Sequence, residues 1–177
     1  EAIFRAVAGV HRRCRGAYAI VAMIAGYGML AFRDPYGIRP LVIGVAEAPG
    51  GPEYMVASES VALEACGFRV LRDVDPGEAI YVDFAGTMHA RQCAESPRLV
   101  PCIFEFVYLA RPDSVIDGTS VYESRIHMGA ALARRISERF PGSGLWKVCI
   151  DLVELSRQTS AKIIEVSRPH WGLRTGL

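Results

Sequence analysis

Ser58–Ser60 (Ser-Glu-Ser) is the segment whose residue types could most readily do chemistry, because it sets two hydroxyls beside an acid. A serine nucleophile needs a histidine or another base within hydrogen-bond reach. We expect His11, His89 and His127 to lie at exposed positions of two helices and a hairpin, where none can activate either serine. A helix cap explains the segment better, because a serine hydroxyl can accept a hydrogen bond from the first turn of a helix predicted at 60–66.

The cysteines could support thiol or metal chemistry only if they lay near one another. There are five, and they are widely scattered: Cys14, Cys66, Cys93, Cys102 and Cys149. None forms the close Cys-x-x-Cys pair that zinc sites favour. We therefore interpret each as a reduced thiol of a cytoplasmic protein, packed as a small hydrophobic side chain.

Two sets of charged residues flank turns, and both favour a structural role over catalysis. Asp34–Gly37 (Asp-Pro-Tyr-Gly) has the type I preference, with Asp first, Pro second and Gly fourth. For Asp34 we expect a side-chain contact within the turn and an ion pair with Arg39. Arg111 and Asp113 could also pair, which the sequence alone leaves open.

Bulk composition bounds the class of protein. The chain has 177 residues, of which 51% are hydrophobic, so it can bury the core of one domain or slightly more. A net charge of +1 gives no electrostatic reason to expect nucleic acid or an anionic membrane as a partner. The most apolar stretch, 17–32, is interrupted by Gly26 and Gly28, and Glu1 opens into a helical pattern with no secretory signal. We therefore expect no membrane partner and no nucleic-acid partner.

The elements that must position these residues follow from hydrophobic periodicity. Apolar residues at helical spacing predict an amphipathic helix at 2–13. The predicted strands lie at 17–24, 29–33, 40–45, 54–58, 69–74, 78–83 and 88–92. Many short strands with one short helix describe a meandering antiparallel sheet. From 122 to 140 the period becomes that of a long helix, and a strand at 148–153 and a helix at 159–166 follow.

The segment 101–114 is a seam between these two patterns. Aromatic Phe104, Phe106 and Tyr108 occupy every second position, which predicts a strand with one buried face. Arg-Pro-Asp-Ser at 111–114 then stops the strand, because proline restricts the residue before it and cannot donate to a sheet ladder. We interpret the seam as the boundary between two domains.

Five motifs stand in order along the chain. They are Gly16–Ala19 (GAYA), Phe32–Leu41 (FRDPYGIRPL), Tyr54–Ser60 (YMVASES), Val74–Glu78 (VDPGE) and Phe104–Ser114 (FEFVYLARPDS). Together they resemble the glutamine phosphoribosylpyrophosphate amidotransferases. Single pieces such as Asp-Pro-x-Gly are shared by related amidotransferases, whereas all five in register are specific. The likeness runs from Ile3 to about Asp151.

The resemblance implies a two-domain enzyme of de novo purine synthesis, both a glutamine amidotransferase and a pentosyltransferase (glycosyltransferase). Its N-terminal-nucleophile (Ntn) glutaminase, a sandwich of two antiparallel sheets between helices, releases ammonia from glutamine. Its phosphoribosyltransferase domain, built on a parallel sheet, uses that ammonia and magnesium to convert phosphoribosylpyrophosphate into 5-phosphoribosylamine and diphosphate. The expected fold class is α+β, an incomplete glutaminase sandwich that leads into the first elements of an α/β domain.

The resemblance also implies domain bounds. Residues 1–100 correspond to the C-terminal part of the glutaminase domain, 101–121 to the inter-domain seam and 122–177 to the start of the phosphoribosyltransferase domain. The tail 154–177 departs from the family pattern. A shifted reading frame, a damaged gene or genuine divergence would each produce such a tail.

Neither active site of the family is complete in these residues. A nucleophile of this class is the first residue of its chain, because its free α-amino group serves as the base, and residue 1 here is Glu. The family's glutamine-gripping residues lie upstream of the matched region, and no diphosphate-binding loop occurs before Leu177. We therefore assign no catalytic residue, and we expect this polypeptide alone to be inactive and to bind no magnesium.

Three residues of the seam occupy positions with a role in the family. Phe104 and Tyr108 match aromatic walls of a channel for ammonia between the two sites, which should be apolar; an ordinary domain-interface core explains them equally well. Cys102 stands where one branch of the family has its first iron–sulfur ligand. One thiol cannot hold a cluster, so we expect none and favour a buried structural thiol.

Two other interpretations are weighed against this one. The chain could be a non-catalytic interaction or remnant protein, whose half-sandwich leaves open sheet edges for a partner or for self-association. Another amidotransferase of the same class, such as one making glucosamine phosphate, fits less well because of the seam at 110–114 and the long helix after it. We expect a cytoplasmic location. For the full enzyme the resemblance implies a homo-oligomer with glutamine and phosphoribosylpyrophosphate as substrates.

Overall fold

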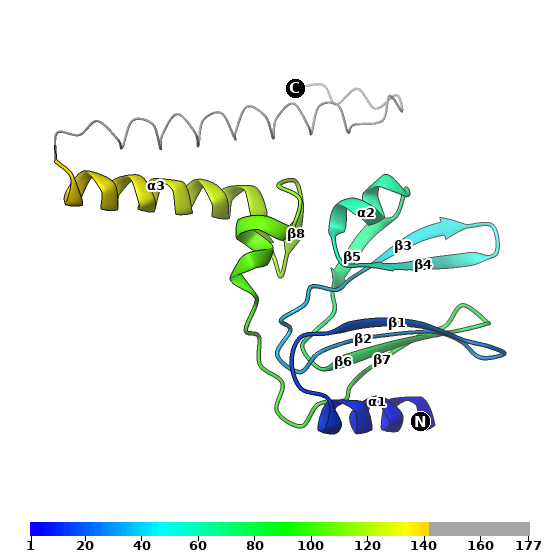
Figure 1. The fold of residues 1–177 in the computed structure, drawn as a ribbon. Coiled ribbons are helices and arrows are strands. Elements are labelled where there is room, and N and C mark those ends of the chain that lie inside the picture. Colours follow the sequence, from blue (N-terminus) through cyan, green and yellow to red (C-terminus); the bar gives the residue numbers. More distant parts are fainter. Residues whose placement is uncertain (142–177) are drawn as a thin grey trace.

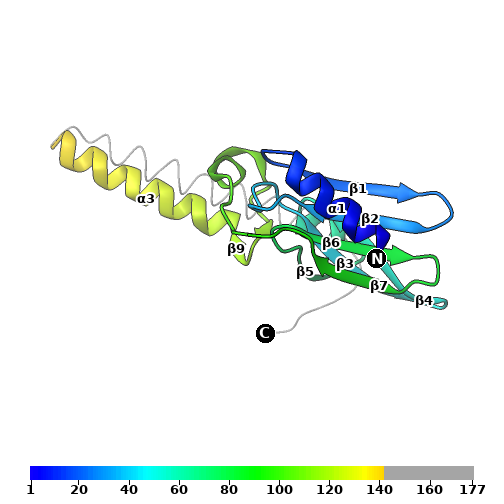
Figure 2. The ribbon, with the colours of Figure 1, turned by 90° about the horizontal axis from the view of Figure 1, so that it is seen from below.

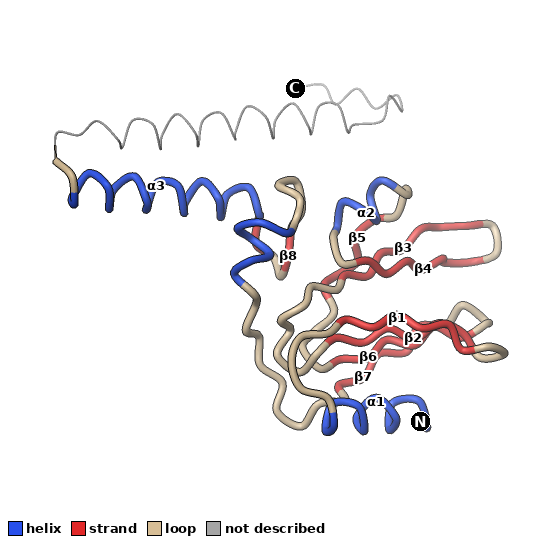
Figure 3. The backbone as a smooth tube through the Cα atoms, in the orientation of Figure 1, coloured by secondary structure: helices blue, strands red, loops and turns tan. Residues whose placement is uncertain are grey.

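A computed structural model describes residues 1–141, and the strand and helix predicted at 148–153 and 159–166 lie outside these residues. The helices are α1 (Ala2–Arg13), α2 (Ser60–Ala65) and α3 (Val121–Arg139), with a π-helical turn η1 (Glu105–Leu109). The strands are β1 (Ala19–Ile24), β2 (Gly28–Arg33), β3 (Val42–Ala48), β4 (Gly51–Ala57), β5 (Arg69–Asp73), β6 (Glu78–Asp83), β7 (Met88–Gln92), β8 (Val115–Ile116) and β9 (Thr119–Ser120) (Figure 3). No helix among residues 1–141 is long and apolar enough to cross a lipid bilayer.

The strands before residue 100 form two antiparallel sheets, so the single meandering sheet predicted from strand spacing is wrong, whereas the two antiparallel sheets that the resemblance implied are present. One sheet has the order β1-β2-β6-β7 and the other β4-β3-β5. β2 is paired on one edge with β1 and on the other with β6, so β3 cannot continue that sheet and begins a second one. Figure 1 shows the sheets stacked, with α1 outside the first and α2 outside the second. The result is a mixed α+β fold of antiparallel sheets with helices, as predicted.

Two apolar clusters hold these layers together, and we call the layers 2–92 the sandwich. Ala31, Leu41, Ile43, Val74 and Ile80 form the cluster between the two sheets. Val7, Leu30, Phe32 and Ala79 form the cluster between α1 and the four-stranded sheet. The helical spacing of apolar residues in α1 explains why this helix lies flat across the sheet (Figure 2). Burial on both faces makes the four-stranded sheet the centre of the sandwich.

The seam is a helical turn, and the predicted aromatic strand is wrong. η1 buries Phe106, which is 9% exposed, together with Glu105 at 5%. Alternation assigns the charged Glu105 to the exposed face, but its buried carboxylate forms an ion pair with Arg39. One carbonyl group of the turn and that of its C-cap residue are also satisfied, because Arg125 donates to the oxygens of Phe106 and Ala110, each at 2.7 Å.

A third apolar cluster lies beyond the sandwich and joins η1 to α3. It consists of Phe106, Ala110, Ile116 and Val121, with Met128 packed against it. α3 begins at Val121, and the hydroxyl oxygen of its N-cap residue Ser120 accepts a hydrogen bond from the Glu123 backbone at 3.2 Å. Figure 1 shows α3 extending away from the two sheets.

Candidate functional site

The exposed aromatic residues of the seam lie on one face of η1 and its N-cap, with Phe104 at the N-cap position and Tyr108 in the turn. Phe104 and Tyr108 are 63% and 79% exposed, and Ile103 and Val107 are exposed beside them. Residues four apart share a face of a helical turn, which separates Phe104 and Tyr108 from buried Phe106. No contact of these residues tests the channel role of the two aromatics, and that role stays a prediction.

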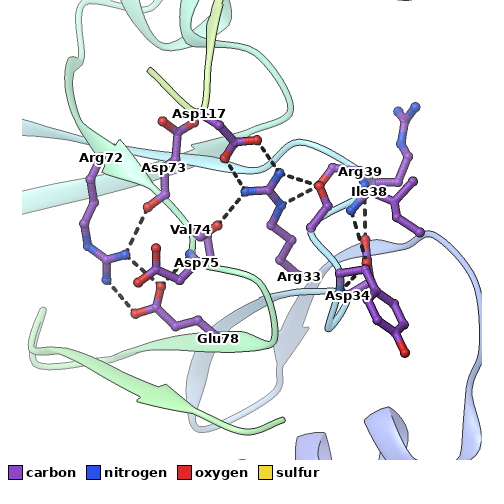
Figure 4. Close-up of polar contacts among 12 residues, drawn as sticks. Arg33, Asp34, Ile38, Arg39, Arg72, Asp73, Val74, Asp75, Glu78 and Asp117 are labelled. Atoms are coloured by element: carbon purple, nitrogen blue, oxygen red, sulfur yellow. Dashed lines mark hydrogen bonds and ion pairs between the residues drawn. The ribbon is translucent and has the colours of Figure 1, made fainter. Parts of the chain in front are cut away.

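Arg33, at the end of β2, is the centre of a polar junction between the sandwich and the seam (Figure 4). Its side chain is 1% exposed, and all five of its N–H groups donate hydrogen bonds. Three reach carbonyl oxygens of Arg39 at 2.7 Å, Val74 at 2.8 Å and Gly37 at 2.7 Å. The other two form a bidentate ion pair with Asp117, at 2.7 and 2.8 Å.

Asp117 lies in a strained turn that the sandwich holds from two sides. Asp117 and Gly118, with φ of 48° and 71°, connect β8 to β9 as a two-residue hairpin turn of type I′. The half-buried carboxylate of Asp73 lies beside the backbone N–H groups of both turn residues. Burial, and to a lesser extent the nearby charge of Asp117, raises the pKa of Asp73. Arg33 therefore binds the side chain of the turn, and Asp73 lies against its backbone.

Asp34 makes the predicted contact within its turn but not the predicted ion pair. Its buried carboxylate accepts backbone hydrogen bonds from Tyr36 at 2.9 Å, Ile38 at 3.2 Å and Arg39 at 3.1 Å. The pairing of its carboxylate with the Arg39 side chain is wrong, because that guanidinium forms an ion pair with buried Glu105 of η1. Backbone donors thus satisfy Asp34, which leaves Arg39 to join the sandwich to the seam.

The Ser58–Ser60 segment binds the seam, and the predicted serine cap of α2 is wrong. Glu59 stands at the N-cap position, and no side chain caps the helix. The Glu59 carboxylate accepts from the Arg111 backbone at 2.8 Å and from the Ser114 hydroxyl at 2.7 Å. The Ser60 hydroxyl oxygen accepts from the Val115 backbone at 3.1 Å. Partners more than fifty residues away have replaced the local cap.

Two further ion pairs frame the junction. Arg111 donates to Asp113 at 3.0 and 2.8 Å, the pair that the sequence left open, and Arg111 thereby lowers the pKa of Asp113. Arg72 of β5 donates to Glu78 of β6, at 2.7 Å to each carboxylate oxygen, and so links the two sheets (Figure 4). The second pair resembles Arg33–Asp117 in geometry, but both of its residues belong to the sandwich and Arg72 is 37% exposed.

His11 is half-buried, and the prediction that it is exposed is wrong; His89 and His127 are exposed as predicted. Its Nε2 lies 3.1 Å from the Gly77 carbonyl oxygen and its Nδ1 2.8 Å from the Tyr18 hydroxyl. A carbonyl only accepts, so Nε2 carries the proton in the neutral ring and Nδ1 accepts from Tyr18. Burial lowers the pKa of His11.

An open pocket of about 390 Å³ lies beside His11. It is lined in part by Arg12, Cys14, Arg15, Tyr36 and Cys93. The basic residues stand at the C-terminal end of α1, where they offset the negative end of the helix dipole. Burial raises the pKa of Cys93, which makes its thiol a poor nucleophile at neutral pH.

Cys102 is a free, half-buried thiol, somewhat more exposed than the buried thiol that we expected. Within residues 1–141 no group of three or more His, Cys, Asp or Glu side chains is arranged to hold a metal ion. The described residues therefore do not fit the ligand set of an iron–sulfur cluster.

The junction residues Arg33, Asp73 and Asp117 were missed by sequence reasoning. One usable signal was present, because Asp117-Gly118 is a favoured dipeptide of two-residue hairpin turns and lies between short β-branched runs. The partnership of Arg33 with Asp117 had no local signal, since 84 residues separate them.

The fold and the site define a class of protein: an α+β layered sandwich that is joined through a buried polar junction to a long helix. No family model matches the chain. The amidophosphoribosyltransferase of Pasteurella multocida is 54% identical over 164 residues, which cover 93% of this chain and 32% of that protein. The Escherichia coli amidophosphoribosyltransferase is 52% identical over 168 residues, covering 94% of this chain and 32% of that protein.

A solved structure matches the backbone as well. Glutamine phosphoribosylpyrophosphate amidotransferase from B. subtilis, complexed with ADP and GMP, superposes with a TM-score of 0.63 at 35% identity. The match covers 72% of this chain and 27% of that one. The chain is therefore a homologue of the amidophosphoribosyltransferases, and it spans about a third of the length of the curated relatives it matches. Coverage of 94% also extends the likeness past Asp151, where the motifs alone had ended it.

Proposed function

We propose that this chain is part of an enzyme that transfers glutamine-derived ammonia to phosphoribosylpyrophosphate, giving 5-phosphoribosylamine, glutamate and diphosphate. The observation that carries the proposal is 54% identity to the Pasteurella multocida amidophosphoribosyltransferase over 93% of the chain. The backbone likeness to the B. subtilis enzyme supports it. This reaction would make the whole protein a glutamine amidotransferase and pentosyltransferase of purine biosynthesis.

Within that enzyme, residues 1–100 would belong to the glutaminase domain, 101–121 to the seam and 122–177 to the start of the phosphoribosyltransferase domain. The separation of the apolar clusters supports this division, because the sandwich clusters use residues up to Cys93 and the third cluster begins at Phe106. Magnesium would act in the phosphoribosyltransferase site of the whole protein. A homo-oligomeric state and a cytoplasmic location stay predictions, as does the inactivity of this polypeptide alone.

The exposed face of η1 is our candidate for a wall of the ammonia path. Phe104 and Tyr108 present large, exposed apolar surfaces side by side at the seam. An apolar wall gives ammonia few hydrogen-bonding partners and disfavours its charged form, because burying an unpaired charge is costly. If no ammonia escapes along such a path, glutamate and phosphoribosylamine would form in equal amounts.

A segment exchange tests the proposed reaction. Residues 1–141 of this chain replace the matching segment of the Pasteurella multocida enzyme, and formation of phosphoribosylamine from glutamine and phosphoribosylpyrophosphate is measured. We expect activity within about tenfold of the parent, since most interface positions tolerate exchange at small cost. A chimera that unfolds cooperatively but has no activity would contradict the proposal.

The channel role is tested in the same chimera. Phe104→Ala with Tyr108→Ala should raise the ratio of glutamate to phosphoribosylamine, because ammonia escapes before transfer. Leu132→Ala is the matched control, since Leu132 is an exposed apolar residue on α3, outside the seam. An unchanged ratio in the double variant would remove these two aromatics from the path.

One observation favours a second candidate, a non-catalytic protein that associates with a second copy of itself. Within residues 1–141, β1 pairs only with β2, so its other edge is open. Val21 and Met23 on this strand are 51% and 73% exposed. Sedimentation of the purified chain decides, because this candidate requires a dimer that Met23→Glu dissociates, whereas a monomer rejects it.

A further inference from the structure

The sandwich and the seam do not share an apolar cluster. Among the described residues, two clusters lie within the sandwich and the third joins η1, β8 and α3. The two parts are instead joined by directional contacts: Arg33 with Asp117, Arg39 with Glu105, and Glu59 with the Arg111 backbone. Hydrogen bonds require a defined geometry whereas apolar burial is non-directional, so this junction can set an angle as well as a contact.

Arg33 is held ready for its partner by the sandwich itself. Three carbonyl oxygens of the sandwich and its loops fix the plane of the guanidinium. Two N–H groups then remain, in the fork that matches a carboxylate. Because Arg33 is 1% exposed, water cannot replace Asp117 without opening the junction.

Asp117 can meet this fork only from one direction. Its turn has two successive residues with positive φ, which fixes how the side chain leaves the backbone. The Asp73 carboxylate lies beside the N–H groups of the same two residues. The side chain of the turn is bound by Arg33 and its backbone lies against Asp73, which leaves the turn little freedom to rotate.

The turn is directly connected to the elements beyond it. β9 ends at Ser120, the N-cap residue of α3, so the position of the turn sets the start of that helix. Arg125 of α3 in turn binds the carbonyl oxygens of Phe106 and Ala110. The turn, α3 and η1 thus form one unit, and that unit carries the exposed face of Phe104 and Tyr108.

We propose that Arg33, Asp117 and Asp73 are positioning residues that hold η1 and the start of α3 at a fixed orientation to the sandwich, and so keep ammonia release aligned with ammonia use. The coupling part of this inference rests on the proposed function. The orientation part does not, since it concerns only residues 1–141.

Hydrogen exchange on the 177-residue chain tests the orientation part. Asp117→Asn removes the charge but keeps a favoured turn sequence, so the hairpin itself should persist. We expect amide exchange at 105–110 and 115–120 to rise about tenfold, with β2 and β6 unchanged. Glu78→Gln is the matched control, because it removes a bidentate arginine–carboxylate pair whose two residues both lie in the sandwich, outside the seam. Equal exchange in wild type and Asp117→Asn, or an equal rise in both variants, overturns the proposal.

The chimera tests the coupling part. Asp117→Asn should raise the ratio of glutamate to phosphoribosylamine several-fold, while Glu78→Gln leaves that ratio unchanged even if it lowers the melting temperature. A general loss of stability would lower both products together and would not change their ratio. If the unsubstituted chimera is inactive, the proposed function fails, and hydrogen exchange still decides the positioning role. An Asp117→Asn chimera whose ratio of glutamate to phosphoribosylamine equals that of the unsubstituted chimera overturns the coupling role.

Discussion

At the scale of single residues, two carboxylates lie near Arg33 but differ in their effect on the free energy of unfolding. Asp117 forms both ion-pair contacts, whereas Asp73 lies beside backbone N–H groups and near a like charge. Asp117→Asn should lower the free energy of unfolding by about 3 kcal/mol, because it removes the anion that is hydrogen-bonded to the buried Arg33 charge. Asp73→Asn should leave the melting temperature unchanged or raise it, since an amide oxygen can face the same N–H groups without repulsion. Equal losses in the two variants, measured by urea unfolding at pH 7, would contradict this account.

The raised pKa of Asp73 also fixes the sign of a pH dependence. In the window just above the ordinary value of 3.8, the folded chain binds a proton at Asp73 more readily than the unfolded chain. The contribution of Asp73 to stability therefore falls as pH rises through that window. Asp73→Asn should remove this slope, as seen from unfolding curves between pH 4 and pH 6, whereas a steeper slope in the variant would refute the assignment.

The contribution of His11 to stability depends on pH with the opposite sign. Its folded pKa lies below the ordinary 6.5, so its contribution to stability is present above that value and is lost as pH falls through the folded pKa. His11→Phe should keep the ring contacts with Tyr18 and Phe32 but remove the titration. The unfolding free energy should then depend less on pH between 7 and 5. The control is His127→Phe on exposed α3, and a pH slope that is the same in wild type and His11→Phe would contradict the prediction.

At the scale of elements, η1 makes a prediction that separates a turn from a strand. Phe106→Ala should cost about 3 kcal/mol, because it empties a buried position of the third cluster. Tyr108→Ala should change stability by no more than about 0.5 kcal/mol, because Tyr108 is 79% exposed. A strand with one buried face would give similar losses at both positions, so urea unfolding of the two variants distinguishes the structures.

Elements before the seam could be predicted because their signals are local. Gly26 and Gly28 mark the turn between β1 and β2, and the apolar spacing of α1 reports the face that it buries. The Asp34 turn followed from its residue order in the same way. The division of the strands into two sheets could not be predicted from local signals, because it depends on β6 pairing with β2.

The candidate site was only partly predictable for the same reason. Phe104 and Tyr108 were found as an aromatic pair, but their separation from Phe106 depends on Arg39 drawing Glu105 inward from 66 residues away. The Ser60 hydroxyl accepts a hydrogen bond from a backbone N–H group 55 residues away instead of capping α2. A pattern read along the chain cannot show such partners, and every contact that joins the sandwich to the seam at the junction is of this long-range kind.

At the scale of the whole molecule, the chain combines a sandwich with its own apolar clusters and a seam whose orientation depends on charged residues. If this seam belongs to an enzyme that makes phosphoribosylamine from glutamine, nitrogen should cross it without leaving the protein. That claim is distinct from activity, because free ammonium in solution could also serve as a nitrogen source. It therefore calls for a measurement that follows the nitrogen atom itself.

The most direct test uses glutamine labelled with ¹⁵N in its amide group, in the chimera that carries residues 1–141, with excess unlabelled ammonium present. Mass spectrometry of the phosphoribosylamine reports which nitrogen was used. We predict that the product keeps the glutamine label in the chimera and loses much of it in Asp117→Asn, with Glu78→Gln as the control that keeps it. Product labelled at the level of the bulk ammonium pool in the unsubstituted chimera, while the parent enzyme retains the label, would contradict the account.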